Sequence, residues 1–304
     1  MIIIDMNQIM ISNLMIAFKK SQLDDNLVRF MVLRSLSKYE QTYGPEYGEL
    51  VLTYDSKHYW RKDYFPYYKH NRKKDRKKSG LDWNSIFELL NKIKEEIKEN
   101  FHYKVVEVMG AEADDVISVL CRHKNPKERI LILSGDKDFI QLHKYPGVVQ
   151  YNPVTKKYVT SENPWEYIRQ HVIKGDKSDG IPNFLSDDDT FVKGIRQRPI
   201  SQKKLNVWVK KDPSYFCQTE QEMNNYIRNQ TLIDMDFVPE EIENKILEEY
   251  NSINNAERKV SLEYFHKHQL TDLLDRFYFS TVNVAMNNKV KHETINFRNS
   301  TKSK

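Results

Sequence analysis

Short runs of apolar, mostly β-branched residues set the strongest limit on how this chain can fold. Long segments with apolar residues three and four positions apart separate these runs, as at 25–39 and at 83–99, where Asp82 supplies an N-cap. This alternation is typical of an α/β fold, in which helices flank a central, mostly parallel sheet. The predicted strands lie at 2–4 (III), 50–54 (LVLTY), 104–109 (KVVEVM) and 130–133 (ILIL).

The strand signal fades after about residue 160, and helical patterns take its place. We therefore predict an α/β domain over residues 1–180, a smaller helical part over 181–285, and a flexible basic tail over 286–304. The helices predicted in the second half lie at 164–173, 201–210, 219–230, 239–253 and 260–275.

Composition excludes several classes of protein. Cys121 and Cys217 lie far apart without ligand spacing, so neither a disulfide framework nor a zinc site is indicated, and a reducing compartment fits best. The first ten residues predict a buried strand and not a signal peptide. No apolar run approaches membrane-spanning length, so we expect no membrane association.

Acidic residues stand where the predicted strands end. Asp5, Asp55 and Asp136 fall just beyond strands, which is where open α/β sheets place their ligand sites. Converging carboxylates cannot stay ionised together without cations. Because all these ligand atoms are oxygens, Mg²⁺ or Mn²⁺ is favoured over Zn²⁺. The candidate metal ligands are Asp5, Asp55, Glu112, Asp114, Asp115, Asp136, Asp138, Asp176 and Asp179.

Each acidic cluster also has a simpler local explanation. The acids at 112–115 open a predicted helix, where negative charge stabilises the helix dipole by about 0.3 to 1 kcal/mol. Asp176 and Asp179 are also compatible with a hydrogen-bonded turn. Neither explanation accounts for acids at the ends of strands from distant parts of the chain. Two ions about 3.5 to 4 Å apart are the usual apparatus for cleaving a phosphodiester, and we predict that reaction, with no serine nucleophile or histidine base.

The positive charge of the chain is concentrated in residues 56–80, which hold ten Lys or Arg against two acids. Aromatic residues interleave with these cations, and such rings stack on unpaired bases at about 1 to 3 kcal/mol each while cations follow the phosphates. Arg61 and Lys69 are candidates to neutralise a scissile phosphate, for which Arg offers a bidentate fork. The alternative is that the aromatic residues belong to the core and the lysines to a solvated helix face. Because the segment follows Asp55, its position favours substrate binding.

Several motifs together resemble the flap endonuclease, or 5′-nuclease, family, in particular its branch of T-even bacteriophage ribonucleases H. The similarity runs from Ile2 to about Asp179 and returns weakly around 227–275. The motifs are IIDMNQI, VLTYDSKHYWRKDYFPYYKHNR, AEADD, ILILSGDKDFIQLHKYPGVVQYNP and KGDKSD.

The resemblance implies a PIN-like fold and a 5′ to 3′ exonuclease and flap endonuclease that removes RNA primers and adjacent DNA during lagging-strand replication. It implies RNA·DNA hybrids, 5′ flaps and nicked duplexes as substrates, and a phage single-strand DNA-binding protein and sliding clamp as partners. We expect a monomer in the cytoplasm of an infected bacterium. The resemblance also implies two Mg²⁺ ions, for which Mn²⁺ would substitute.

The resemblance assigns roles to individual residues. A first ion would be held by Asp5, Asp55, Glu112, Asp114 and Asp136, and a second by Asp138, Asp176 and Asp179, while Asp115 matches an acid of less certain role. The catalytic set would be Asp5, Asp55 and Asp136 with Arg61 and Lys69. Residues 56–80 would form an arch over the 5′ single strand, and 181–285 would bind duplex. The nucleic-acid contacts would be Arg61, Lys62, Tyr68, Lys69, Arg72, Lys73, Lys74, Lys77, Lys78, Lys203 and Lys204.

One stretch departs from the family pattern. Relatives continue GDxxDNIPG into a GIGxKTA hairpin that grips the duplex backbone, whereas here GIPN precedes Asp187, Asp188 and Asp189. These acids would repel phosphate, which argues against the usual grip and leaves Lys203 and Lys204 as phosphate contacts.

Three other functions agree less well with the sequence. A phosphatase of the haloacid dehalogenase type would carry its general acid two residues after the first Asp, and that position is Asn7. A small PIN-type ribonuclease would need about four acids and no helical second half. A binding module that had kept the fold without the catalysis would be expected to have lost some of the acids.

Overall fold

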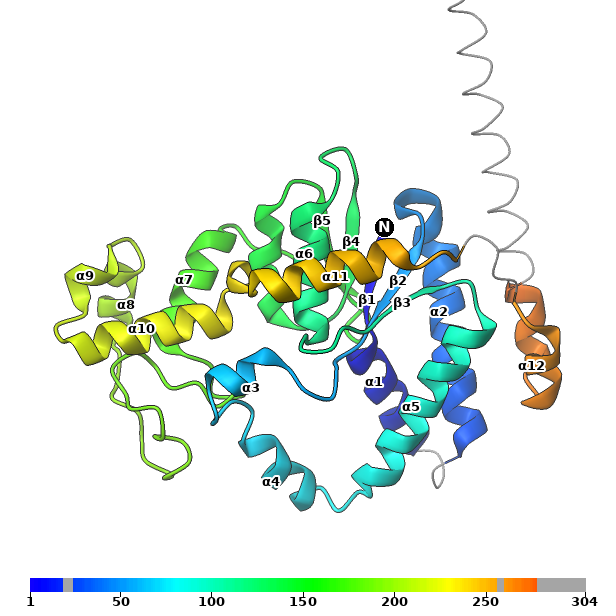
Figure 1. Cartoon of the computed structure of the whole chain (residues 1–304), viewed down its shortest axis with the longest axis horizontal. Coiled ribbons are helices and arrows are strands. Elements are labelled where there is room, and N and C mark those ends of the chain that lie inside the picture. Colours follow the sequence, from blue (N-terminus) through cyan, green and yellow to red (C-terminus); the bar gives the residue numbers. More distant parts are fainter. Residues whose placement is uncertain (19–23, 256–259, 278–304) are drawn as a thin grey trace, which may run out of the picture.

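A six-stranded sheet forms the centre of the computed structural model, which describes residues 1–18, 24–255 and 260–277 (Figure 1). The strand order is β3-β2-β1-β4-β5-β6, with β6 antiparallel to β5 and every other neighbouring pair parallel. The mostly parallel α/β fold predicted from the sequence is confirmed. The strands are β1 (Ile2–Asp5), β2 (Leu50–Thr53), β3 (Lys104–Val106), β4 (Ile130–Leu133), β5 (Val148–Asn152) and β6 (Lys157–Val159).

The sheet is buried on both faces, which explains why its central strands read as continuous apolar runs. Ile2 and Ile4 of β1 face one core, and Ile3 faces the other. The first core is closed by α1 (Met6–Phe18), α2 (Asp25–Tyr47) and α5 (Trp83–Asn100). The second is closed by α6 (Ala113–His123), the 3-10 helix η1 (Lys137–Lys144) and α11 (Glu240–Ser252).

Several of these elements were not predicted from the sequence. Helix α1 starts directly after β1, at a place where only a buried strand was expected. Strands β5 and β6 lie at the edge of the sheet and are partly exposed, so they lack the apolar run that marked the others.

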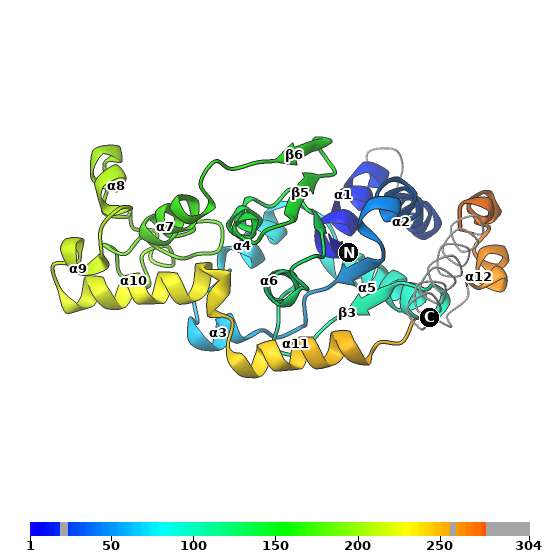
Figure 2. The ribbon, with the colours of Figure 1, turned by 90° about the horizontal axis from the view of Figure 1, so that it is seen from above.

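The helices after residue 181 are divided among three places in the molecule, and α11 belongs to the second core. Helices α8 (Gln202–Trp208), α9 (Pro213–Phe216) and α10 (Glu220–Ile233) share a third core with α7 (Pro164–Lys174). Helix α12 (Leu262–Lys267), followed by the 3-10 helix η3 (Thr271–Leu273), packs instead at the opposite end of the molecule, against the α1–α2–α5 core (Figure 2). The tail predicted over 286–304 lies outside the described residues.

The basic segment leaves the sheet after β2 and returns to it through α5 (Figure 1). It contains α3 (Trp60–Tyr64) and α4 (Asn71–Lys78). Phe65 and Tyr68 between these helices belong to the third core, while α4 has no buried residue. Among the helices of the described ranges, none has the length and apolar character needed to cross a membrane.

Candidate metal centre

The carboxyl ends of β1, β2 and β4 bring three predicted acids to one edge of the sheet. Asp5 is the last residue of β1, and Asp55 and Asp136 follow the two neighbouring strands. The pKa of Asp5 is raised to about 6, mainly by burial and to a smaller extent by the negative charges of Asp55 and Asp136. The three carboxylates therefore lie within electrostatic reach of one another, as the sequence predicted.

Polar groups that the sequence did not single out hold these acids in place. Asp5 accepts hydrogen bonds from the backbone of Gln8 (3.1 Å) and from the hydroxyl of Ser134 (3.0 Å). Asp55 accepts one from the amide of Ala113 at 2.8 Å, which fixes it to the first turn of α6. Strand ends and helix start thus form one rigid edge.

Asp114, in the first turn of α6, faces the same region. Burial raises its pKa well above the ordinary value, and Glu112, Asp136 and Asp55 add to the effect, while Lys69 opposes it. Asp114 makes no hydrogen bond or ion pair with any other residue in the described ranges. A half-buried carboxylate without a hydrogen-bond donor, among other acids, favours a bound cation.

Five of the predicted acids line one cavity of about 390 Å³. Lys69 and Arg72 also line it, together with Tyr167 and His171 from α7. The acids are Asp114, Asp136, Asp138, Asp176 and Asp179.

Glu112 and Asp115 do not line this cavity and are buried in the protein. Glu112, 1% exposed, accepts hydrogen bonds from Lys69 Nζ at 2.6 Å and from Arg61 and Tyr68 at 3.0 Å each. Asp115 is fully buried, pairs with Arg61 at 2.7 Å, and forms with Glu112 the capping box of α6. Both carboxylates are occupied by protein donors, so the geometry gives no support to their assignment as metal ligands.

Arg61 and Tyr68, predicted to contact nucleic acid, are also interior residues. Arg61 is 3% exposed and donates to the Leu232 carbonyl (3.0 Å) as well as pairing with the two buried acids. The Tyr68 hydroxyl lies 3.0 Å from both Glu112 and Asp179. Both side chains are almost fully buried, so the structure offers neither of them to a bound strand. The expectation that they contact the substrate has to be corrected on this ground.

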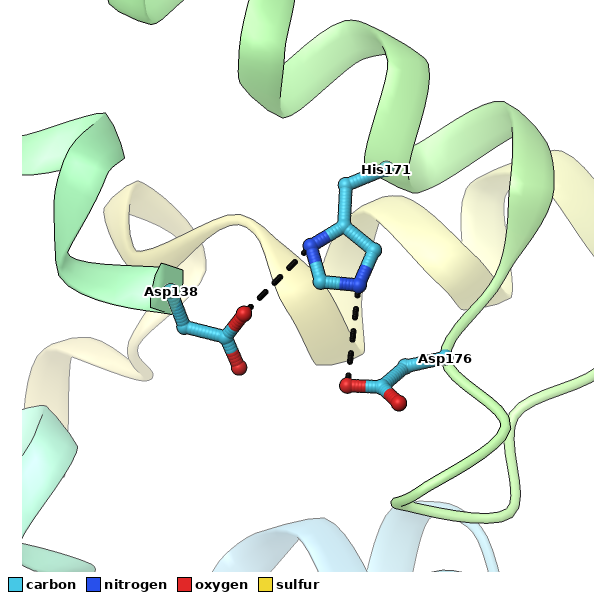
Figure 3. A group of neighbouring side chains, drawn as sticks. All are labelled: Asp138, His171 and Asp176. Atoms are coloured by element: carbon cyan, nitrogen blue, oxygen red, sulfur yellow. Dashed lines mark ion pairs between the residues drawn. The ribbon is translucent and has the colours of Figure 1, made fainter. Parts of the chain in front are cut away.

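A second group of side chains lies at the end of the cavity near α7. His171 Nδ1 is 3.5 Å from Asp138, and Nε2 is 3.5 Å from Asp176 (Figure 3). Burial raises the pKa of Asp138 to about 7, with a further contribution from Asp136. Burial alone would lower the pKa of His171, but Asp176 and Asp138 raise it. His171 was not among the residues predicted from the sequence, because a site of oxygen ligands requires no histidine, although His171 stands five residues before Asp176.

Asp179 connects this group to the basic segment. Its carboxylate pairs with Arg72 at 2.8 Å and lies 3.5 Å from Lys69 Nζ. Its backbone carbonyl accepts a hydrogen bond from the Lys69 amide at 2.7 Å. The loop that carries Asp176 and Asp179 is thereby attached to the start of α4.

Comparison with known proteins identifies the family. Residues 1–172 match the family described as "5'-3' exonuclease, N-terminal resolvase-like domain", and residues 166–279 match "T4 RNase H, C terminal". The chain belongs to the 5′-3′ exonuclease family. It is 35% identical to the ribonuclease H of Enterobacteria phage T4 over 89% of this chain and 92% of that protein. A 5'-3' exonuclease of Buchnera aphidicola is 31% identical over 44% of this chain and 47% of that protein.

Solved structures of 5′-3′ exonuclease family members share the fold. The bacteriophage T5 protein crystallised with metal ions superimposes with a TM-score of 0.57 at 16% identity, over 82% of this chain and 98% of that one. The T5 flap endonuclease in complex with DNA and metal ions gives 0.55 at 17% identity, over 83% and 99%. The predicted family, the PIN-like fold and the assignment as a nuclease are confirmed.

Proposed function

We propose that this 5′-3′ exonuclease family member is a divalent-metal-dependent 5′ to 3′ exonuclease and flap endonuclease that removes RNA primers and adjacent DNA from the lagging strand. The observation that carries the proposal is one cavity lined by acids that follow β4, open α6 and stand in the 176–179 loop. Asp5 and Asp55 from the neighbouring strand ends lie within electrostatic reach of these acids. The raised pKa values of Asp5, Asp114 and Asp138 describe a site that is incomplete without cations.

The donor set fits two hard divalent ions. We assign Asp5, Asp55, Asp114 and Asp136 to the first ion, and Asp138, Asp176 and Asp179 to the second. Mg²⁺ is the expected ion, with Mn²⁺ as a substitute, because carboxylates dominate both sets. When bound, the ions would supply an activated water and neutralise charge at the leaving 3′ oxygen.

Residues next to these acids have supporting roles in the proposal. Lys69 and Arg72 line the cavity, so their positive charge favours the entry of a phosphate. Glu112 keeps Lys69 in place through its 2.6 Å hydrogen bond, and Asp115 with Arg61 fixes the start of α6. Glu112, Asp115 and Arg61 thus act on the site through its framework and not by contact with the substrate.

The exposed cations of α4 extend this path for a 5′ single strand. Lys73, Lys74, Lys77 and Lys78 are exposed, as is Lys62 on α3. Tyr64 is the one aromatic residue of α3 with substantial exposure, and it remains available for stacking on a base.

A second cavity, of about 550 Å³, lies beside the base of α4 and supports duplex binding. Lys174, Lys177, Arg196 and Arg198 line it together with Asn71. These residues replace the family hairpin in the proposal, with exposed Lys203 and Lys204 as further phosphate contacts.

The acids of the same segment are partly neutralised. Asp188 pairs with Arg228, and Asp189 pairs with Lys193 at 2.6 Å. The repulsion of phosphate expected from these acids is therefore reduced.

The test uses a 5′-labelled RNA·DNA hybrid, a nicked duplex and a 5′-flap DNA, each with Mg²⁺, Mn²⁺ or a chelator. We expect short products from the 5′ end of the hybrid and cleavage near the flap junction with either metal. Equal cleavage in the chelator would contradict the proposal. The biological part of the proposal, primer removal in an infected bacterium beside a single-strand DNA-binding protein and a sliding clamp, is tested by primer processing in a reconstituted replication reaction.

A further inference from the structure

His171 lies in the last turn of α7, between two of the acids assigned to the second ion (Figure 3). Its side chain is 18% exposed, and its Nδ1 is buried without a hydrogen bond. Among the described residues that line the cavity it is the one histidine. A buried ring nitrogen without a hydrogen bond, directed at a carboxylate 3.5 Å away, is left without a strong partner.

The spacing of the three side chains suits the ligands of a single ion. One ligand atom from each of Asp138, His171 and Asp176 can be chosen so that all lie within 4.8 Å of one another. Ligands on opposite sides of an ion lie roughly 4 Å apart, because metal–ligand distances are about 2.0 to 2.2 Å. Small adjustments of these side chains would therefore enclose a cation.

We propose that His171 supplies a nitrogen ligand to the ion held by Asp138 and Asp176, and that this second position therefore binds a transition-metal ion such as Co²⁺ or Mn²⁺ with higher affinity than the Mg²⁺ expected in the reaction. The inference rests on the proposed function, since it assumes an ion at that position. Imidazole is a good ligand for transition metals, whereas Mg²⁺ favours oxygen and retains its water. The first position, which has carboxylates only, keeps its preference for hard ions.

The test detects the nitrogen ligand directly. The full-length protein is loaded with Mn²⁺ without substrate, and pulsed electron paramagnetic resonance is used to detect coupling between the ion and ¹⁴N. We expect this coupling in the natural chain and in the control His70→Gln, whose histidine is exposed beside α4. His171→Gln should abolish it while Mn²⁺ remains bound to the other acids. Persistent coupling in His171→Gln would overturn the inference.

Metal titrations supply a second readout that does not depend on activity. His171→Gln should weaken Co²⁺ binding at the second position by about tenfold or more, as expected for the loss of a ligand contact. Mg²⁺ binding should change much less, and equal losses for both ions would contradict the predicted preference. If Gln disturbs folding as judged by circular dichroism, His171→Asn allows the same comparison.

The two proposals fail in different ways. Two bound ions without nitrogen coupling would reject His171 as a ligand and leave the nuclease proposal intact. If only one ion binds and Asp138→Asn does not change its affinity, the second position itself is rejected.

Discussion

Arg61 shows how individual residues maintain the site from within the protein. Its guanidinium carries the positive charge that two fully buried carboxylates, Glu112 and Asp115, require. It also satisfies the carbonyl of Leu232 at the end of α10. The basic segment, α6 and α10 are thereby joined at a single side chain.

Replacing Arg61 with Met should destabilise the protein by about 3 to 5 kcal/mol, because the buried Asp115 loses its counterion and Glu112 keeps only Lys69. Urea unfolding measures the loss. The matched control is Lys62→Met, the exposed neighbour on the same helix, which should change stability little. A stable Arg61→Met protein with weakened DNA binding would instead support direct contact with the substrate.

The pKa of Asp5 predicts how the metal-free protein responds to pH. Its folded value of about 6 lies above the ordinary 3.8, so the folded state binds this proton more tightly than the unfolded state. The contribution of Asp5 to the free energy of unfolding is fully present below about pH 4 and is lost as the pH rises through about 6. This contribution is at most about 3 kcal/mol. In the presence of chelator, we therefore compare the free energy of unfolding of Asp5→Asn with that of the natural chain at two pH values. The difference should favour the variant more at about pH 8 than at about pH 5.

Thermal unfolding in Mg²⁺ completes this test. Added Mg²⁺ should raise the melting temperature of the natural chain at about pH 8, since binding to the folded state stabilises it, and should have a smaller effect on Asp5→Asn. An identical pH response in both proteins would mean that Asp5 titrates normally.

The two ion positions should respond differently to the loss of one acid. Asp136→Asn should abolish cleavage, because Asp136 belongs to the first set and is exposed in the cavity. Asp179→Asn should leave partial activity, since an amide oxygen can still accept from Arg72 or Tyr68. Single-turnover rates on the 5′-flap substrate measure both, and comparable residual rates would contradict the division into two sets.

The types of residue in the site were predictable, but their orientations were not. Acids at strand ends could be inferred because parallel strands deliver their carboxyl ends to one edge. Nothing in the pattern of the basic segment reveals that Arg61 turns inward, since its carbonyl partner Leu232 lies 171 positions away. His171 was equally hidden, because its partners come from η1 and from the loop after α7.

Helix α4 presents most of its basic residues to solvent. It carries basic residues and has no buried residue, so its sequence is not explained by packing. The alternative of a purely solvated helix face remains testable by salt dependence.

Changing Lys73, Lys74, Lys77 and Lys78 together to Ala should weaken binding of a 5′-flap DNA and flatten its salt dependence. Each lost contact should reduce the slope of log K against log salt by about 0.9 for duplex or about 0.7 for a single strand. Fluorescence anisotropy measures the slope. A control with the same loss of charge changes exposed lysines away from the cavities, namely Lys92, Lys127, Lys156 and Lys157. Equal slopes in both variants would leave α4 as a solvated face.

The positions of the helices after residue 181 show what periodicity can and cannot predict. Their existence follows from apolar residues at helical spacing, and most lie where they were predicted. Which core each helix joins depends on contacts far apart in the sequence, as when Tyr264 of α12 meets Phe101 after α5. The helical pattern alone therefore led to the prediction that α8–α12 form one helical part.

At the scale of the whole molecule, the last described residues of the chain pack against the core of the sheet domain. Phe101 packs against Tyr264, Phe265 and Phe277 with ring centroids 5.1 to 5.8 Å apart. Helix α12 therefore helps to close the core that supports β1 and its Asp5.

Phe265→Ala should lower the free energy of unfolding by about 3 to 5 kcal/mol, as is typical for a buried phenylalanine. Chemical denaturation measures this, with Leu262→Ala on the same helix as the control, since Leu262 is 44% exposed. A loss no larger than in the control would show that α12 is not needed for the sheet domain.

The attachment of α4 to the 176–179 loop has a thermodynamic consequence. Lys69 and Arg72 at the start of α4 both hold Asp179, and Gly180 approaches so closely that an added Cβ would lie 2.9 Å from the Tyr67 carbonyl. Any shift of α4 caused by a bound strand would therefore displace Asp179, which we assign to the proposed second ion. Ion binding and strand binding would be linked, and reciprocity requires each to change the affinity for the other by the same factor.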